Sequence, residues 1–134
     1  MTRFVLDAGA VLHVTGTAPF EVAPGHELLA PTLVRSQTLS LLHEAVARGE
    51  LTAEAALAQH ERIGRLRMRL LGDAVLRRVA WKLADRLAWP ETYTAEYLAL
   101  TQLQADAFVT LDRELARLVE GIVPLAPVDA LRAP

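Results

Sequence analysis

The segment Arg3-Phe4-Val5-Leu6-Asp7-Ala8-Gly9-Ala10 sets the frame for the rest of the chain. Its apolar run at residues 4–6 is too short for a helix, so it predicts a strand buried on both faces of a parallel sheet. Asp7 follows the run directly and is followed by small residues. Ligands of open parallel sheets bind at the carboxyl ends of the strands. Asp7 is therefore a candidate functional residue, and the alternative is that it only caps the helix expected next.

The composition is typical of one folded domain. The chain has 134 residues, 52% of them hydrophobic, and a formal net charge of −2. This length suits a single core, so we expect one domain spanning residues 1–134. The absence of cysteine excludes disulfides and thiolate zinc sites. Neither a signal peptide nor an apolar run long enough for a bilayer is present, so we expect a cytoplasmic protein without a membrane span.

Apolar periodicity and breaker residues predict alternating helices and extended segments. We expect helices at residues 11–14, 31–48, 52–67, 73–89, 94–104 and 112–121, and short apolar or extended segments at residues 28–30, 68–71, 107–110 and 122–125. Pro31 is expected as the first residue of its helix. This order predicts a three-layer α/β/α domain with a small parallel sheet.

A second acid, Asp112, closes the strand expected at residues 107–110. If this strand is a parallel neighbour of the first, the carboxylates of Asp7 and Asp112 reach the same edge of the sheet. Carboxylate oxygens that converge there suit Mg²⁺ or Mn²⁺. Such ions activate a water and hold the phosphoryl oxygens of an in-line displacement.

Four blocks of the sequence resemble, in order and spacing, those of the PIN-domain family, and most closely the VapC-type toxins of toxin–antitoxin pairs. They are residues 6–10 (LDAGA), 30–33 (APTL), 94–100 (TAEYLAL) and 109–112 (VTLD). The resemblance covers nearly the whole chain. It implies a three-layer PIN-like fold, a ribonuclease that uses Mg²⁺ or Mn²⁺, RNA as the substrate, an antitoxin protein as a candidate partner, and a homodimer.

The same resemblance places the family's four acidic positions at Asp7, Gln37, Thr94 and Asp112. Gln37 stands where the family usually has Glu, and Thr94 where it usually has Asp. Metal affinity in oxygen sites depends on the number of ligand charges, so the loss of two charges should weaken Mg²⁺ binding. Asp7 and Asp112 would then hold the metal, with water in the remaining positions.

Two further residues are candidates for the same site. Glu96 could replace the acid missing at Thr94 only if the helix begins after Thr94, because two residues along a helix turn the side chain by about 200°. Thr110 is expected to hydrogen-bond and orient Asp7. The alternatives are a solvated helix residue for Glu96 and an ordinary strand residue for Thr110.

A cluster of arginines is a candidate RNA-binding surface. Arg62, Arg65 and Arg69 share one stripe if their helix continues far enough. Phosphate contacts dominate nucleic-acid affinity, so such a stripe could bind RNA. The alternative is a solvated face. Tyr97 is expected to contribute to packing.

Three functional hypotheses follow from the sequence. The first is a PIN-type ribonuclease that acts as the toxin of a pair. The second is a catalytically inactive PIN-like binding or interaction module, which Gln37 and Thr94 motivate. The third is a phosphatase or phosphotransfer domain of the haloacid-dehalogenase type, which also begins with a strand ending in Asp; that chemistry needs a second acid at position 9, which is Gly here.

Overall fold

The computed structural model describes residues 1–133. Its elements are β1 (Thr2–Leu6), α1 (Ala8–Val14), β2 (His26–Pro31), α2 (Leu33–Ala47), α3 (Ala53–Arg65), β3 (Met68–Leu71), α4 (Ala74–Leu87), α5 (Tyr93–Gln104), β4 (Ala107–Val109), α6 (Arg113–Val119) and the 3-10 helix η1 (Val128–Leu131). None of the helices in this range is long and apolar enough to cross a membrane.

The strands form a parallel sheet in the order β3-β2-β1-β4. Because β1 pairs with a strand on each side, it lies inside the sheet, and Val5 and Leu6 are fully buried. The predicted two-sided buried strand is therefore confirmed. Leu6 pairs with Val109, so the residues that follow β1 and β4 emerge at the same edge of the sheet.

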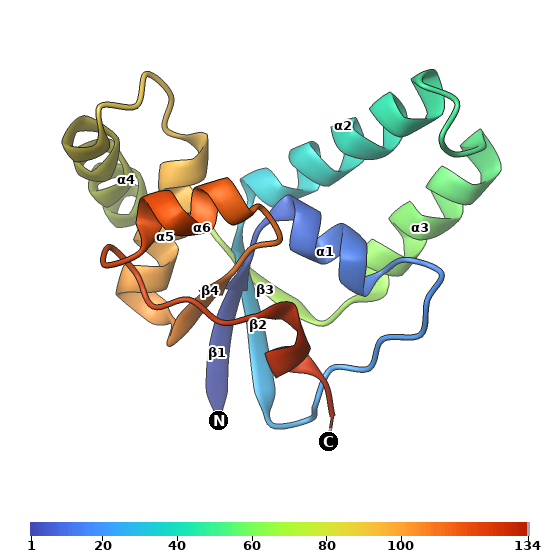
Figure 1. Cartoon of the computed structure of the whole chain (residues 1–134), viewed down its shortest axis with the longest axis horizontal. Helices are drawn as coiled ribbons and strands as arrows, with labels where there is room; N and C mark the ends of the chain where they lie inside the picture. The colour runs from blue at the N-terminus through green and yellow to red at the C-terminus, as the bar shows by residue number, and fades with distance from the viewer. Residues whose placement is uncertain (134) are drawn as a thin grey trace.

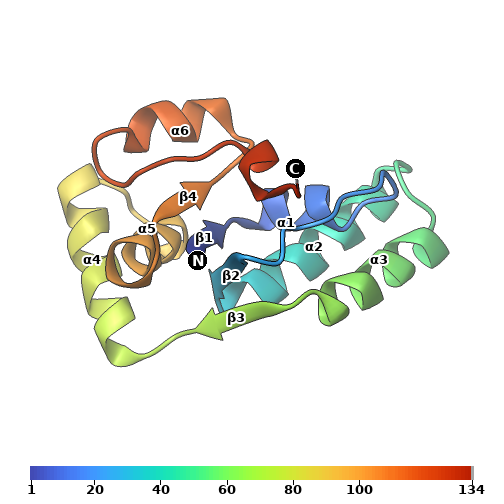
Figure 2. The same cartoon turned by 90° about the horizontal axis from the view of Figure 1, so that it is seen from below.

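Helices cover both faces of the sheet in a three-layer α/β/α arrangement, which confirms the predicted fold class (Figures 1 and 2). α5 packs across β1, β2 and β4, and α4 packs outside α5. α1 and α2 cover the opposite face, and α3 packs against α2. Figure 1 shows the α2–α3 hairpin reaching outward beyond the sheet.

Most of the helices begin at the capping residues that the sequence predicts. Asp7, Thr52, Asp73 and Asp112 are N-caps, and each side chain accepts a hydrogen bond from the backbone N–H three residues later. Gly49, with φ of 76°, follows the end of α2, where a left-handed residue is favoured.

Two expected boundaries differ in the structure. Pro31 is the last residue of β2 rather than the first residue of a helix, because it pairs with Leu71 of β3. α2 therefore begins at Leu33. Residues 122–125 are extended and make only isolated bridges, one of which joins Leu125 to Phe108.

The condition for one arginine stripe, a helix that continues to Arg69, is not met. α3 ends at Arg65, and the chain turns into β3, which contains Arg69. The pairing of β3 with β2 overrides the helical continuation that the stripe required. The Arg62 Nε donates to the Thr15 carbonyl at 2.9 Å, and Arg69 lies 3.6 Å from a Glu27 carboxylate oxygen.

Candidate functional site

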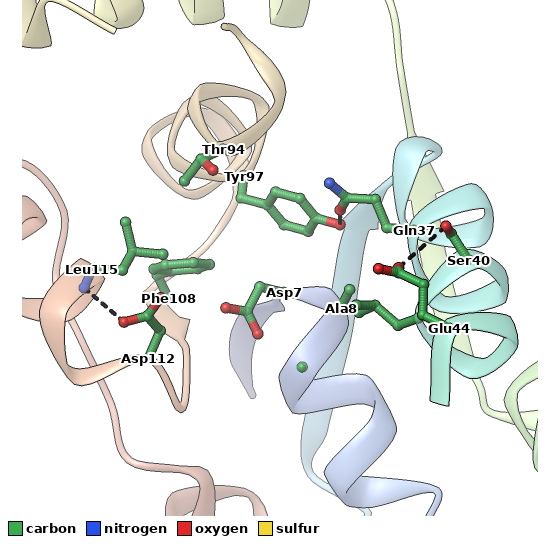
Figure 3. Close-up of a pocket in the computed structure, with 12 residues that line it drawn as sticks. Asp7, Ala8, Gln37, Ser40, Glu44, Thr94, Tyr97, Phe108, Asp112 and Leu115 are labelled. Carbon is green, nitrogen blue, oxygen red and sulfur yellow. Dashed lines mark hydrogen bonds between the residues drawn. The ribbon is translucent and has the colours of Figure 1, made fainter. Parts of the chain in front are cut away.

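A cavity of about 350 Å³ lies at the carboxyl edge of the sheet, where β1 and β4 end (Figure 3). Asp7 and Asp112 line it from the strand ends; Gln37, Ser40 and Glu44 line it from α2; Thr94 and Tyr97 line it from α5. The structure thus brings together all four positions that the family resemblance indicated, at the edge predicted from the strand order.

The Thr110 hydroxyl connects the two aspartates. It donates to Asp7 Oδ2 at 2.5 Å and accepts a hydrogen bond from the Asp112 backbone N–H at 3.1 Å. The predicted hydrogen bond from Thr110 to Asp7 is therefore confirmed. The Thr110 side chain, at the end of β4, therefore fixes the Asp7 carboxylate relative to the backbone of Asp112.

Helix capping holds both carboxylates in place. Asp7 Oδ1 accepts from the Ala10 N–H at 2.9 Å, and Asp112 Oδ1 accepts from the Leu115 N–H at 3.0 Å. The capping role considered for Asp7 is thus present, and it does not exclude a functional one, because Asp7 also lines the cavity. Because each carboxylate caps the first turn of a helix, that turn fixes the orientation of the carboxylate.

Burial raises the pKa of Asp7 above its ordinary value. Hydrogen bonds from Thr110 and Ala10 oppose this shift, and the negative charge of Asp112 adds to it. Asp7 and Asp112 line the same cavity. Two such groups favour a cation between them.

The helix side of the cavity is organised by a contact between α5 and α2. Tyr97 is 2% exposed, and its hydroxyl donates to Gln37 Oε1 at 2.5 Å. Burial and the nearby negative charges of Asp7 and Glu96 raise the pKa of Tyr97 above its ordinary value, so the phenol stays protonated and remains a donor. Tyr97, expected to contribute to packing, also reaches the cavity with its polar end.

The structure brings Thr94 to the cavity and leaves Glu96 outside the residues that line it. α5 begins at Tyr93, so Thr94 is already helical, and Glu96 is turned about 200° from it. Burial raises the pKa of Glu96, and the positive charge of Arg77 on α4 opposes the shift. Glu96 could replace the missing acid only if the helix began after Thr94, and this condition is not met.

Ser40 and Glu44 line the cavity and were not among the predicted site residues. The Ser40 hydroxyl donates to Glu44 Oε2 at 3.4 Å. Their positions, three and seven residues after Gln37, recur on the same face of a helix. That spacing was the signal in the sequence that could have identified them.

Within residues 1–133, no three His, Cys, Asp or Glu side chains gather closely enough to hold a metal ion. The cavity therefore has the carboxylates of Asp7 and Asp112 at the strand ends and the neutral side chains of Gln37, Thr94 and Tyr97 on the helices. A further carboxylate, Glu44, lines it two turns beyond Gln37 on α2.

Two solved structures are similar to this chain. The crystal structure of PAE2754 from Pyrobaculum aerophilum matches with a TM-score of 0.71 and 18% sequence identity, covering 97% of this chain and 92% of that chain. The structure of VapBC-1 from nontypeable Haemophilus influenzae matches with a TM-score of 0.64 and 12% identity, covering 94% of this chain and 98% of that chain. No protein-family model and no curated protein sequence matches the chain. At these identities the likeness shows the fold, which is a three-layer α/β/α PIN-like fold.

Proposed function

We propose that this protein is a PIN-type endoribonuclease that cleaves RNA with a divalent cation, Mg²⁺ or Mn²⁺, held by Asp7 and Asp112. One observation carries the proposal. The two acids follow neighbouring parallel strands, line one cavity, and are linked through Thr110. Carboxylates that converge at the carboxyl edge of a parallel sheet suit metal-assisted phosphodiester cleavage.

The donor set fits a cation that the substrate helps to bind. Mg²⁺ often uses one or two carboxylates and fills its remaining positions with waters and substrate phosphates. Asp7 and Asp112 supply these two carboxylates, while the Gln37 carbonyl is already engaged by the Tyr97 hydroxyl. We therefore expect weak cation binding by the free protein and stronger binding when RNA is present.

The residues of the chain have separate tasks in this proposal. Asp7 and Asp112 hold the cation and are kept in position by the caps of α1 and α6. Thr110 orients Asp7 through its hydroxyl. A bound divalent cation supplies positive charge to the phosphate oxygens and lowers the pKa of water, and this is the chemistry that hydrolysis of a phosphodiester needs.

The fold shared with VapBC-1 supports the role of a toxin in a cytoplasmic toxin–antitoxin pair, with a homodimer as the working unit. Light scattering coupled to size exclusion tests the dimer. Co-expression with the product of the neighbouring reading frame tests the antitoxin. A monomer at all concentrations, or the absence of any complex, would contradict the corresponding part of the proposal.

The deciding experiment is cleavage of single-stranded and structured RNAs in Mg²⁺ and in Mn²⁺. Asp7→Asn and Asp112→Asn should each lower the rate by at least about 100-fold, because each removes a charge that acts on the transition state. Asp85→Asn is the control, since Asp85 is an exposed acid on α4 that does not line the cavity. Cleavage that persists in Asp7→Asn would come from a contaminant and would defeat the proposal.

A second candidate function is a PIN-like binding module without catalysis. It is favoured because no three acids within residues 1–133 lie close enough together to hold a metal ion, and because the Gln37 oxygen already accepts a hydrogen bond from Tyr97. In that case the unaltered chain should show neither cleavage nor heat of Mn²⁺ binding by calorimetry. Tight binding of Mn²⁺ would contradict this candidate.

A further inference from the structure

The amide of Gln37 is oriented by its contact with Tyr97. The buried Tyr97 hydroxyl donates to Gln37 Oε1, so the carbonyl oxygen of this amide faces the tyrosine. The amide nitrogen therefore lies on the other side, and Figure 3 shows it on the side of Thr94 and away from Asp7. Gln37 lines the cavity, so its two N–H donors are available to a ligand there, and one of the two lone pairs of its carbonyl oxygen is used by Tyr97.

Thr94 has a similar character. Its hydroxyl can donate a hydrogen bond, and the residue lies in the first turn of α5, where the helix carries partial positive charge. Both Gln37 and Thr94 are partly exposed and line the same cavity. At the two positions where the PIN resemblance implies acids, this chain therefore has hydrogen-bond donors.

We propose that Gln37 and Thr94 bind the phosphate oxygens of RNA directly, as hydrogen-bond donors, and are not ligands of the cation. The inference rests on the proposed function only in taking RNA as the substrate. The cavity then has two sides with different tasks. The carboxylates of Asp7 and Asp112 bind the cation, and the donors of Gln37 on α2 and Thr94 on α5 bind the anion. Glu44, two turns beyond Gln37 on α2, accepts a hydrogen bond from Ser40.

Charge is the physical reason for this division. A carboxylate at position 37 or 94 could only accept hydrogen bonds and would repel a phosphate unless a cation lay between them. An amide and a hydroxyl can contact the phosphate without a cation. Each hydrogen bond to a charged group is strong enough that losing one should weaken binding by about tenfold or more.

The test separates anion binding from metal binding. The probe is a single-stranded RNA with 2′-O-methyl groups, which resists cleavage, and its binding is measured by fluorescence anisotropy in EDTA. Mn²⁺ binding is measured by calorimetry without RNA. Gln37→Met keeps the length of the side chain and removes its donors. Gln37→Glu keeps the shape and replaces the donors with a charge.

We expect Gln37→Met to weaken RNA binding in EDTA by about tenfold and to leave Mn²⁺ binding unchanged. Gln37→Glu should weaken RNA binding further and strengthen Mn²⁺ binding. A Gln37→Met variant that loses Mn²⁺ affinity and keeps RNA affinity would overturn the inference. So would an unaltered chain that does not bind the RNA in EDTA.

Thr94→Val is an independent variant in case Gln37→Met does not fold. It should also weaken RNA binding in EDTA and leave Mn²⁺ binding unchanged. Inorganic phosphate is tested in the same buffer, and binding as tight as that of the RNA would overturn the assignment to RNA. If the chain binds RNA as described but cleaves none, the inference holds and only the proposed nuclease fails.

Discussion

The two sides of the cavity differ in how the fold supports them. Asp7 and Asp112 follow strands, cap the helices that come next, and share the Thr110 hydroxyl. Gln37 and Thr94 are placed on helices, and neither caps a helix. An acid on the strand side therefore serves the fold as a helix cap as well as the site. The helix-side residues have no capping role, and Gln37 contributes to the fold only by accepting the hydrogen bond of Tyr97.

This difference teaches where the chemistry of a site can change at little cost to stability. Replacing an N-cap by a non-capping residue costs about 1 kcal/mol, so the strand-side acids are held by the folding requirement as well. A helix-side residue that faces the cavity has no capping role. The departures from the PIN resemblance, Gln37 and Thr94, both lie on the helix side.

The largest expected effect comes from changing the side-chain length by one carbon at one residue on each side of the cavity. Asp7→Glu should lower RNA cleavage by about 100-fold, because a displacement of about 1 Å at a reacting centre has that effect. Gln37→Asn should lower it by roughly tenfold or less, the loss of one phosphate contact. Single-turnover and steady-state kinetics give both values, and equal losses would remove the distinction between the two sides.

Thr110→Val should destabilise the fold by about 1 to 3 kcal/mol, because it leaves Asp7 Oδ2 and the Asp112 N–H without their shared partner. It should also raise the pKa of Asp7 further, since the hydrogen bond from Thr110 lowers that pKa. Urea unfolding and a titration of Asp7 by NMR measure the two effects. Thr110→Ser, which keeps the hydroxyl, should behave like the unaltered chain.

Tyr97→Phe should have a smaller effect, with a loss of stability of about 0.5 to 1.5 kcal/mol. Without the hydroxyl, the Gln37 amide is free to turn and present its oxygen to the cavity. RNA binding in EDTA should weaken and Mn²⁺ binding should strengthen, each by a few-fold at most. Unchanged affinities would mean that Tyr97 does not orient the amide.

The smallest effect is a dependence of stability on pH. Burial raises the pKa of Asp7, so the folded chain keeps this proton to a higher pH than the unfolded chain. Ionised Asp7 therefore lowers stability above its folded pKa, and the stability returns as the pH falls through that pKa. Compared with Asp7→Asn, the unaltered chain should gain stability as the pH falls through the folded pKa of Asp7, and the gain should be complete below the ordinary pKa of an aspartate, about 4. A gain in the opposite direction would contradict the shift.

The local features of the fold could be predicted because short-range physics decides them. The apolar run before Asp7 is long enough only for a strand, and the caps at Thr52 and Asp73 begin helices by contacts within three residues. The boundary at Pro31 could not be predicted. It depended on the pairing of β2 with β3, which joins segments about forty residues apart.

The sequence by itself determined the buried strand, the acids at the ends of β1 and β4, and the neutral residues at the two positions where the PIN resemblance implies acids. The tertiary structure decided that β4 lies beside β1, so that a hydroxyl at position 110 reaches a carboxylate at position 7. It also decided that Tyr97 meets Gln37, 60 residues away along the chain, and fixes the orientation of the Gln37 amide by a hydrogen bond to its oxygen. The reason is that periodicity and capping act over a few residues, whereas contacts between distant side chains depend on how the whole sheet and its helices pack.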